Sequence, residues 1–141
     1  MELKLNKLFY DDIRVGDTFF FEKMVDRELV DKFADLSGDK NPLHVDESYA
    51  EKTEFGGRIA HGMLLGSFFS ALIGMLCPGE RSLYLSQTLN FRKPIKPNSR
   101  ITIEGKVTAK SDAAKIIEIE TVVKDDKGAV AVSGIAKVKI R

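Results

Sequence analysis

Two side chains that could exchange protons with a substrate lie close together in the segment LSGDKNPLH, residues 36–44. Asp39 supplies a carboxylate and His44 an imidazole, and Pro42 stiffens the segment by biasing Asn41 toward extended conformations. Such a pair, held at a fixed separation, can grip one water molecule and exchange protons with it, as adding water to a double bond requires. Taken alone, the spacing is better explained by structural roles, because Asp and Asn commonly cap turns and helices and His44 can simply hydrogen-bond the backbone.

A second candidate lies where a long apolar segment begins, in RIAHGM at residues 58–63. A helix N-terminus presents unpaired N–H groups and a positive dipole end, and glycine lets a ligand oxygen approach. If a thioester carbonyl lay against the Gly62 N–H, that N–H would stabilise the enolate formed during water addition. Such oxyanion stabilisation raises the reaction rate by about 10²-fold or more. Taken alone, Gly62 is more typical of a packing or cap residue. His61, which with His44 makes up the histidines of the chain, is more typical of a cap or supporting residue than of a catalyst.

The elements that must position these residues begin with a strand and a helix. Asp17–Val25 is rich in aromatic residues and predicts the strand. The helix follows, with Asp26 as its N-cap and Gly38 as its stop. Its apolar stripe consists of Leu29, Val30, Phe33, Ala34 and Leu36.

A polar loop and two further helices are predicted next. Residues 38–46 form the loop, and Asp46 can cap a short helix that runs through Ala50 and Lys52. Met63–Cys77 is apolar almost all round, which predicts a helix that other elements surround on several sides. That stretch is shorter than the roughly 18–20 apolar residues that a membrane span needs.

The second half of the chain predicts the sheet that surrounds this helix. Apolar and polar residues alternate over 83–91 and 101–107, and two more strands are predicted at Ile116–Val123 and Val130–Ile140. The turn signal DDKG at 125–128 joins the last two strands. Short links favour antiparallel neighbours, so we expect an α+β fold in which an antiparallel sheet wraps around one central helix.

Composition limits the remaining function classes. The 141 residues suit one domain, and 22 Lys and Arg nearly cancel 21 Asp and Glu, so no global charge recruits nucleic acid or an anionic membrane. Cys77 is the only cysteine, which excludes an intramolecular disulfide and leaves no convincing metal-ligand set. The first ten residues lack the unbroken apolar core of a signal peptide. We therefore expect a cytoplasmic protein with no metal, redox cofactor, nucleic-acid partner or membrane association.

The segment FADLSGDKNPLHVDESYA, residues 33–50, resembles the hydratase motif of the MaoC-like, (R)-specific enoyl-CoA hydratase family, with every expected position filled. The segments IAHGMLLGSFFSALIG (59–74) and SLYLSQTLNFRKPI (82–95) resemble the same family. The similarity covers most of the chain and is weakest in the first dozen residues and the last two strands. It implies the hot-dog fold, with residues 1–141 as a single domain.

The resemblance also implies roles for individual residues. Asp39 would be the general base and His44 would share the catalytic water, while a proton reaches the α-carbon on the same face. Gly62 would supply the oxyanion N–H. Ser70 matches a family serine near the acyl pocket, although a serine bonded back into its own helix explains it equally well. The family is typically homodimeric with the site at the subunit boundary, and an unpaired edge strand favours a dimer on physical grounds.

An acyl-CoA is the expected substrate, and its phosphates call for local positive charge. Arg92 and Lys93 in FRKPIKP, residues 91–97, supply that charge beside an aromatic residue, although a solvated strand connection is an equal alternative. The acyl chain would lie along the central helix near Met63. Asn41 of the catalytic loop completes the expected substrate-binding residues, and the length of the acyl chain stays open.

Three functions compete for this fold. A hydratase, a hot-dog thioesterase and a non-catalytic acyl-CoA-binding module would share it, so the fold does not discriminate among them. The complete motif around Asp39 and His44 favours the hydratase, because a thioesterase must aim water at the thioester carbon and a binding module needs neither residue. A dehydratase acting on acyl carrier protein thioesters runs the same chemistry in reverse and also stays open.

Overall fold

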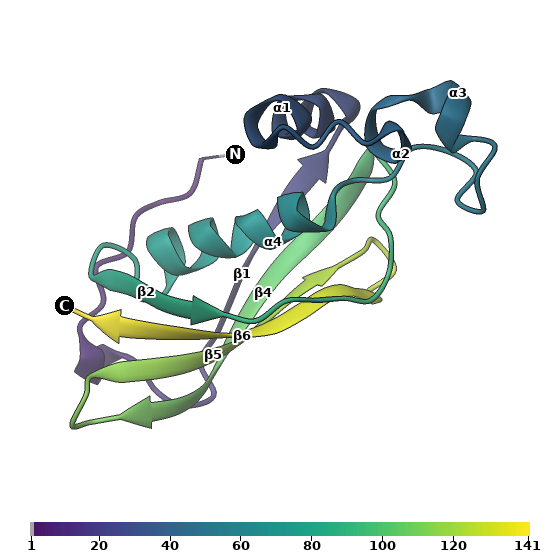
Figure 1. Ribbon diagram of the computed structural model, residues 1–141. Coiled ribbons are helices and arrows are strands. Elements are labelled where there is room, and N and C mark those ends of the chain that lie inside the picture. The colour runs from purple at the N-terminus through teal and green to yellow at the C-terminus, as the bar shows by residue number, and fades with distance from the viewer. Residues whose placement is uncertain (1) are drawn as a thin grey trace.

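A curved antiparallel sheet and a helix lying across its inner face form the framework of the molecule (Figure 1). The computed structural model describes residues 2–141. The strands run in the order β1-β4-β5-β6-β2, and β3 pairs with β6. The strands are β1 (Thr18–Val25), β2 (Ser82–Gln87), β3 (Asn90–Phe91), β4 (Ser99–Ser111), β5 (Ile116–Lys124) and β6 (Val130–Ile140). The helices are η1 (Tyr10–Asp12), α1 (Arg27–Ser37), α2 (Pro42–Val45), α3 (Glu47–Ala50), α4 (Gly62–Ala71) and η2 (Leu72–Leu76).

Alternation along the strands builds the layer of side chains that faces α4. In β4, Ile101, Ile103 and Val107 are 0% exposed, whereas the polar residues between them reach the other face. Leu65 and Phe69 of α4 pack into one core with Ile101 and Ile103, whereas Val107 belongs to a second buried cluster. Each such side chain contributes roughly 1.5–3 kcal/mol when it leaves water. The predicted antiparallel sheet around a buried helix is confirmed.

Helix α1 begins and ends at the predicted residues. The Asp26 side chain accepts a hydrogen bond from the Leu29 N–H at 2.8 Å, and Gly38 ends the helix in the left-handed conformation with a φ of 82°. Of the predicted stripe, Val30 is fully buried, but Leu36 is 84% exposed. The prediction for Leu36 was wrong because α1 covers only one end of the sheet. The face that α1 buries is narrow and does not include Leu36.

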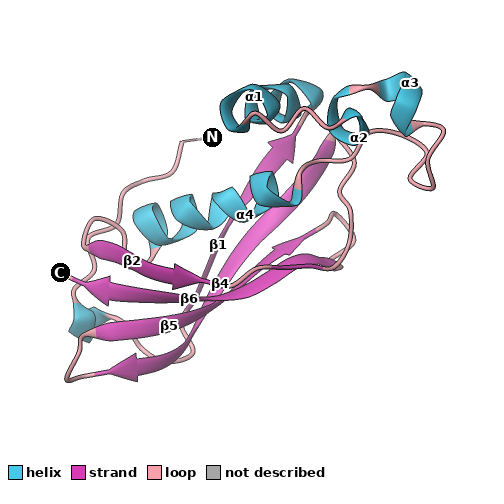
Figure 2. Cartoon of the chain, in the orientation of Figure 1, coloured by secondary structure: helices cyan, strands magenta, loops and turns pink. Residues whose placement is uncertain are grey.

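Two helices near residues 36–63, α2 and α4, differ from the prediction. Residues 42–45, predicted as loop, form the single turn α2, whose N-cap Asn41 accepts from the Leu43 N–H at 3.0 Å. Helix α3 follows its predicted N-cap Asp46 but ends at Ala50, before the predicted Lys52. The apolar helix α4 passes into the π-helical turn η2 at Leu72, and Met63 is 58% exposed, so the segment is not buried all round at its start. Figure 2 shows α1, α2 and α3 gathered at the end of the molecule where α4 begins.

The strand predicted over residues 83–91 is two strands. A register shift between Tyr84 and Ser86 and a break after Gln87 separate β2 from the two-residue β3. Strand β1 forms one edge of the sheet, and β2 and β3, which both pair with β6, form the other. Across residues 2–141, no helix combines the length and the apolar character that crossing a bilayer requires.

Candidate active site

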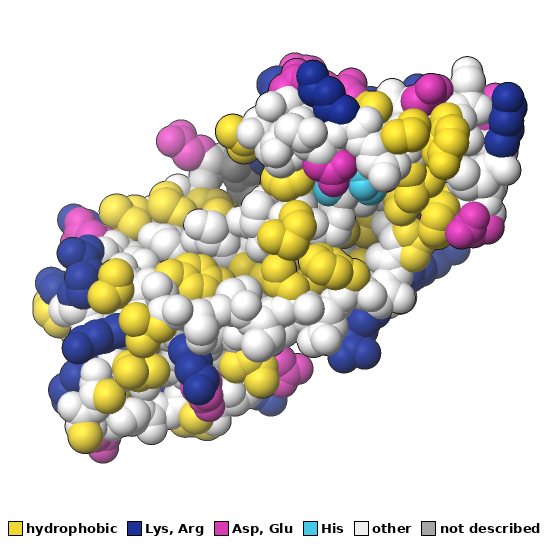
Figure 3. Space-filling model, viewed as in Figure 1, with side chains coloured by type: hydrophobic (Ala, Val, Ile, Leu, Met, Phe, Trp, Pro, Cys, Tyr) yellow, Lys and Arg dark blue, Asp and Glu magenta, His cyan; other side chains and the backbone are white. Residues whose placement is uncertain are grey.

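A pocket of about 360 Å³ opens where α4 begins, between the α2 region and the strands β3 and β6. Of the predicted site residues, Asp39, His44, Gly62, Met63, Arg92 and Lys93 line it. Apolar side chains from the helix and the sheet complete the wall, among them Phe55, Leu65, Phe91, Ile95 and Val132. In the space-filling view (Figure 3), histidine and acidic surface meet hydrophobic side chains at the edge of a hollow. The pocket therefore combines titratable groups with an apolar wall, as sites for small molecules commonly do.

The Asp39 carboxylate is held by the turn that follows α1. Its backbone N–H donates to Ser37 Oγ at 3.1 Å, and its Oδ1 accepts from the Asn41 N–H at 3.2 Å. The second oxygen, Oδ2, faces His44 at 4.0 Å, and the side chain is 51% exposed. One carboxylate oxygen thus anchors the loop while the other points toward the imidazole.

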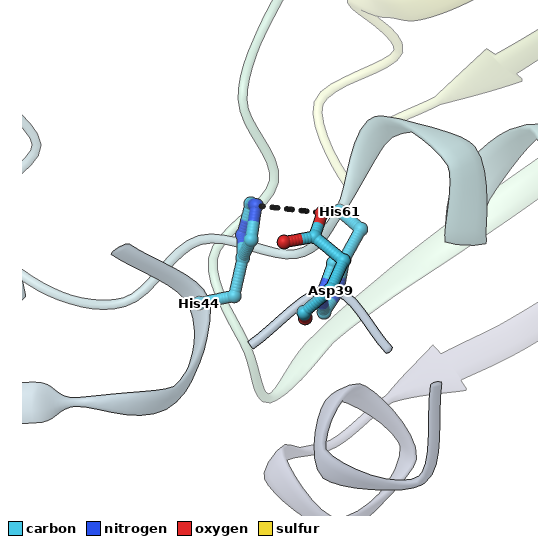
Figure 4. A group of neighbouring side chains, drawn as sticks. All are labelled: Asp39, His44 and His61. Carbon is cyan, nitrogen blue, oxygen red and sulfur yellow. Dashed lines mark hydrogen bonds and ion pairs between the residues drawn. The ribbon is translucent and has the colours of Figure 1, made fainter. Parts of the chain in front are cut away.

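The His44 ring is oriented by a carbonyl. Its Nδ1 lies 2.8 Å from the Ile59 carbonyl oxygen, which can only accept a hydrogen bond, so Nδ1 carries the proton. The lone pair of the neutral ring then resides on Nε2, which faces Asp39 Oδ2 at 4.0 Å (Figure 4). Two acceptors at this separation cannot bond each other, but one water molecule can donate a hydrogen to each.

His61 supports both members of this pair. Its side chain is buried, with the residue 1% exposed, and its Nε2 donates to the Asp39 carbonyl oxygen at 2.9 Å. Its ring stacks on His44 with a centroid separation of 3.9 Å and meets Phe33 edge-on at 4.9 Å. Burial lowers the pKa of His61, although the hydrogen bond to Asp39 opposes that shift. A neutral, buried ring thus holds the Asp39 backbone and the face of His44 at once.

Asp39, His44 and His61 each offer a ligand atom within 4.8 Å of the others, which makes them the candidate metal group among residues 2–141. Their chemistry fits a metal poorly. Carbonyls occupy Nδ1 of His44 and Nε2 of His61, and the rings stack at 26°, so their remaining lone pairs lie in nearly parallel planes. A protein zinc site needs three or four convergent ligands. The group is better suited to proton transfer.

Gly62 is the first residue of α4, and its amide belongs to the first helical turn, where N–H groups have no intrahelical acceptor. Because Gly62 lacks a Cβ, the Phe91 ring packs directly over it: a Cβ there would lie 2.6 Å from Phe91 Cδ1. Gly62 thus lines the pocket at the positive end of the α4 dipole, beside Asp39 and His44, with the Phe91 ring against it.

The basic residues of the pocket rim differ in how they are paired. Lys93 Nζ donates to Asp125 Oδ2 at 2.5 Å, and this bond is the main reason that the pKa of Asp125 is lowered. Arg92 Nε instead donates to Ser133 Oγ at 2.7 Å, and its side chain stays exposed. The Lys93 charge is therefore paired with Asp125 in the β5–β6 turn. Arg92 has no such ion pair among the described residues, so it is the better-placed cation for an anionic ligand.

Two predicted substrate-binding residues lie outside the pocket wall. Asn41 caps α2 and, through its N–H, holds Asp39. Ser70 is an exposed residue near the end of α4, and its substrate-binding role stays a prediction. Sequence reasoning missed Arg58, which is 8% exposed and donates to the His44 carbonyl, because burial of a charged side chain depends on the fold.

The fold and the site together define a hot-dog-fold protein whose pocket holds the Asp39 carboxylate and the His44 imidazole at the start of the central helix. A family model described as "MaoC like domain" matches residues 14–129. The chain belongs to this MaoC-like domain family.

Individual relatives agree with this assignment. The (R)-specific enoyl-CoA hydratase of Aeromonas caviae is 41% identical over 91% of this chain and 96% of its own length. The 3-hydroxybutyryl-CoA dehydratase of Methylorubrum extorquens is 38% identical over 74% of this chain and 66% of its own length. The solved structure of an (R)-hydratase from A. caviae superimposes with a TM-score of 0.89 at 40% identity, covering 92% of this chain and 98% of that one.

Proposed function

We propose that this protein is an (R)-specific enoyl-CoA hydratase, which adds water to a trans-2-enoyl-CoA to give the (R)-3-hydroxyacyl-CoA. The observation that carries the proposal is the pair of acceptors, Asp39 Oδ2 and His44 Nε2, that face each other at 4.0 Å beside the N-terminus of α4. The names of the A. caviae and M. extorquens relatives, a hydratase and a dehydratase of CoA thioesters, support the reaction class.

The geometry suggests how the reaction runs. Asp39 and His44 hold one water molecule, and as its oxygen bonds to the β-carbon, Asp39 accepts the proton that the oxygen loses. The π electrons move toward the thioester carbonyl, where the Gly62 N–H stabilises the enolate oxygen. The α-carbon then takes up the proton that Asp39 carries, on the same face, so one H and one OH are added and Asp39 is again a carboxylate. Dehydration is the same path reversed.

The test is the loss of enoyl-thioester absorbance when the protein is added to crotonyl-CoA, followed by chiral analysis of the product. Asp39→Asn and His44→Ala should each lower kcat by about 10²–10⁴-fold while the protein stays folded. Asp35→Asn is a matched control, because this exposed carboxylate of α1 pairs with Lys40 at 3.3 Å and does not belong to the residues that line the pocket. A near-wild-type kcat for hydration in either site variant would contradict the mechanism.

The same assay separates the competing functions. Release of free CoA from saturated acyl-CoAs without hydration would identify a thioesterase. Binding of acyl-CoA without either reaction would identify a binding module. A comparison of CoA and acyl carrier protein thioesters at equal concentration would show which carrier the pocket prefers.

We further propose a cytoplasmic homodimer that needs no metal or redox cofactor. The uncharged edge strand β2 supports a dimer, since unprotected edges favour pairing with another chain. The lone, buried Cys77 thiol is in keeping with a reducing compartment. An acid–base pair suffices for hydration of an activated double bond, so the reaction calls for no further group.

A further inference from the structure

A buried arginine ties the His44 backbone to α1. Arg58 is 8% exposed, which is rare for this residue type unless its charge is paired. We infer that Arg58 is a positioning residue that fixes His44 in the orientation required for proton transfer, an inference that rests on the proposed function. Arg58 does not belong to the residues that line the pocket, so it acts through His44 and not by contact with the substrate.

The guanidinium of Arg58 makes two hydrogen bonds in different directions. Its Nε donates to the His44 carbonyl oxygen at 2.5 Å, and its Nη2 donates to Asp31 Oδ1, also at 2.5 Å. Asp31 lies on α1, and its side chain is 54% exposed. One planar group therefore links α1 to α2 from the segment that leads into α4.

Helix α2 depends on such support because it has only four residues. Isolated helices of this length are unstable in water, and the last carbonyls of any helix lack intrahelical donors. Residues 58 and 59 supply donors to two of these carbonyls: Arg58 bonds the His44 oxygen, and the Ile59 N–H bonds the Leu43 oxygen at 3.2 Å. The Ile59 carbonyl in turn accepts from His44 Nδ1 at 2.8 Å. Backbone and ring of His44 are thus fixed by two adjacent residues.

Only arginine suits this position. Its Nε–H and Nη–H groups are held in one plane and point to separate acceptors, whereas lysine carries a single ammonium on a flexible stem. A lysine at position 58 can reach the carbonyl or the carboxylate, but it cannot bridge them in the same geometry. We expect His44 to become more mobile in that variant, because its ring would keep the bond to Ile59 and the stacking on His61 but its backbone would lose the Arg58 anchor.

The test is a double-mutant cycle between Arg58 and His44, measured by crotonyl-CoA hydration. Arg58→Lys should lower kcat by about 10²-fold, because small misplacements of a catalytic group have effects of that size, and should change KM by less than about threefold. In a His44→Ala background, assayed at proportionally higher enzyme concentration, the same substitution should change kcat by less than about twofold. Arg27→Lys on α1 is the matched control, since Arg27 forms an exposed ion pair with Glu47 at 3.6 Å.

The cycle separates positioning from general structural support. A near-wild-type kcat for Arg58→Lys, or an equal loss in both backgrounds, would overturn the inference. If Arg58→Lys does not fold, Asp31→Ala removes the other anchor of the guanidinium, and the same criteria apply: a loss confined to the His44-containing background supports the inference, and no loss or an equal loss overturns it.

A second measurement does not require activity. The chain has two histidines, so ¹⁵N-labelled rings give signals that His61→Gln assigns. Wild-type protein should show a protected His44 Nδ1–H, which Arg58→Lys should broaden or abolish while His61 Nε2–H persists. An unchanged His44 signal would overturn the inference. Failure of the wild-type protein to hydrate any enoyl-CoA would instead count against the proposed function and leave this readout valid.

Discussion

At the scale of single residues, the pair of histidines shows how burial assigns different roles to the same side chain. His44 keeps one nitrogen at the pocket, whereas His61 is 1% exposed and uses its Nε2 to hold the Asp39 carbonyl. Its remaining nitrogen, Nδ1, is buried without a hydrogen-bond partner among the described residues. Protonating His61 would place a charge in that environment, so the folded state favours the neutral ring.

This environment predicts a pH dependence of stability. Burial lowers the pKa of His61 in the folded protein below its ordinary value of 6.5, which the unfolded chain restores. Between the two pKa values the unfolded state binds more protons than the folded state. The contribution of His61 to the free energy of unfolding is therefore fully present above pH 6.5. It is lost as the pH falls through the pKa that His61 has in the folded protein. One such proton changes the free energy of unfolding by at most about 1.4 kcal/mol per pH unit.

Urea unfolding of wild-type protein and of His61→Gln between pH 8 and pH 5 measures this contribution. Glutamine keeps an N–H donor for the Asp39 carbonyl but does not titrate, so carboxylates that titrate in both proteins cancel in the difference. The wild-type curve should fall more steeply below pH 6.5 than that of the variant. Parallel curves would show that His61 does not couple to folding.

The sequence alone could predict the residues of the site more fully than their supports. The family resemblance predicted that Asp39, His44 and Gly62 act together, and all three line the pocket. It could not predict that His61 stacks on His44 at 3.9 Å or that Arg58 is buried beneath the same loop. Those contacts join segments that are 14 or more positions apart, and only the packing of α1, α2 and α4 brings them together.

At the scale of elements, local capping chemistry was predictable and tertiary constraints were not. The predicted helix caps lie where expected, at Asp26, Gly38 and Asp46. Cap preferences arise from hydrogen bonds within a few residues, so the sequence reveals them. Helix α2 was not predicted because four residues are too few to show a periodic pattern. It is stabilised by hydrogen-bond donors from residues 58 and 59, which are distant in the sequence. The break between β2 and β3 likewise reflects pairing with β6 and not the alternation of the residues themselves.

The start of α4 offers a test of the oxyanion position. In Gly62→Ala, the new Cβ would lie 2.6 Å from Phe91 Cδ1, but the Phe91 ring is 54% exposed and can turn aside into the pocket mouth. We therefore expect kcat/KM for crotonyl-CoA to fall by about 10–10²-fold with little change in the thermal unfolding midpoint.

Gly74→Ala is the matched control for that substitution, because a Cβ at Gly74 of η2 meets nothing within 4 Å. Its activity should equal that of the wild type, and its stability should be equal or up to about 1 kcal/mol higher. Full activity of Gly62→Ala would argue that the carbonyl binds elsewhere, and unfolding of that variant would show that the Phe91 contact is structural.

At the scale of the whole molecule, the sheet leaves two edges that differ in chemistry. Edge strand β1 includes the charged residues Glu22 and Lys23, which discourage pairing with another chain. Edge strand β2 has the sequence SLYLSQ without any charge, and its Leu83 and Leu85 are each 48% exposed. Ile135 of the neighbouring β6 is also 48% exposed, so the apolar surface extends beyond the edge. These features favour β2 as the edge that a second copy would cover.

The proposed dimer can therefore be tested by placing one charge on each edge. Leu85→Glu on β2 should shift the mass measured by light scattering from two chains to one at micromolar concentration, because pairing would bury the new carboxylate. Met24→Glu on β1 changes a residue that is 43% exposed and should leave the dimer intact. If Met24→Glu dissociates the protein and Leu85→Glu does not, the copies meet through β1. If the wild type has the mass of one chain, the active site is complete within a single subunit, and the pocket at the start of α4 must bind its substrate unaided.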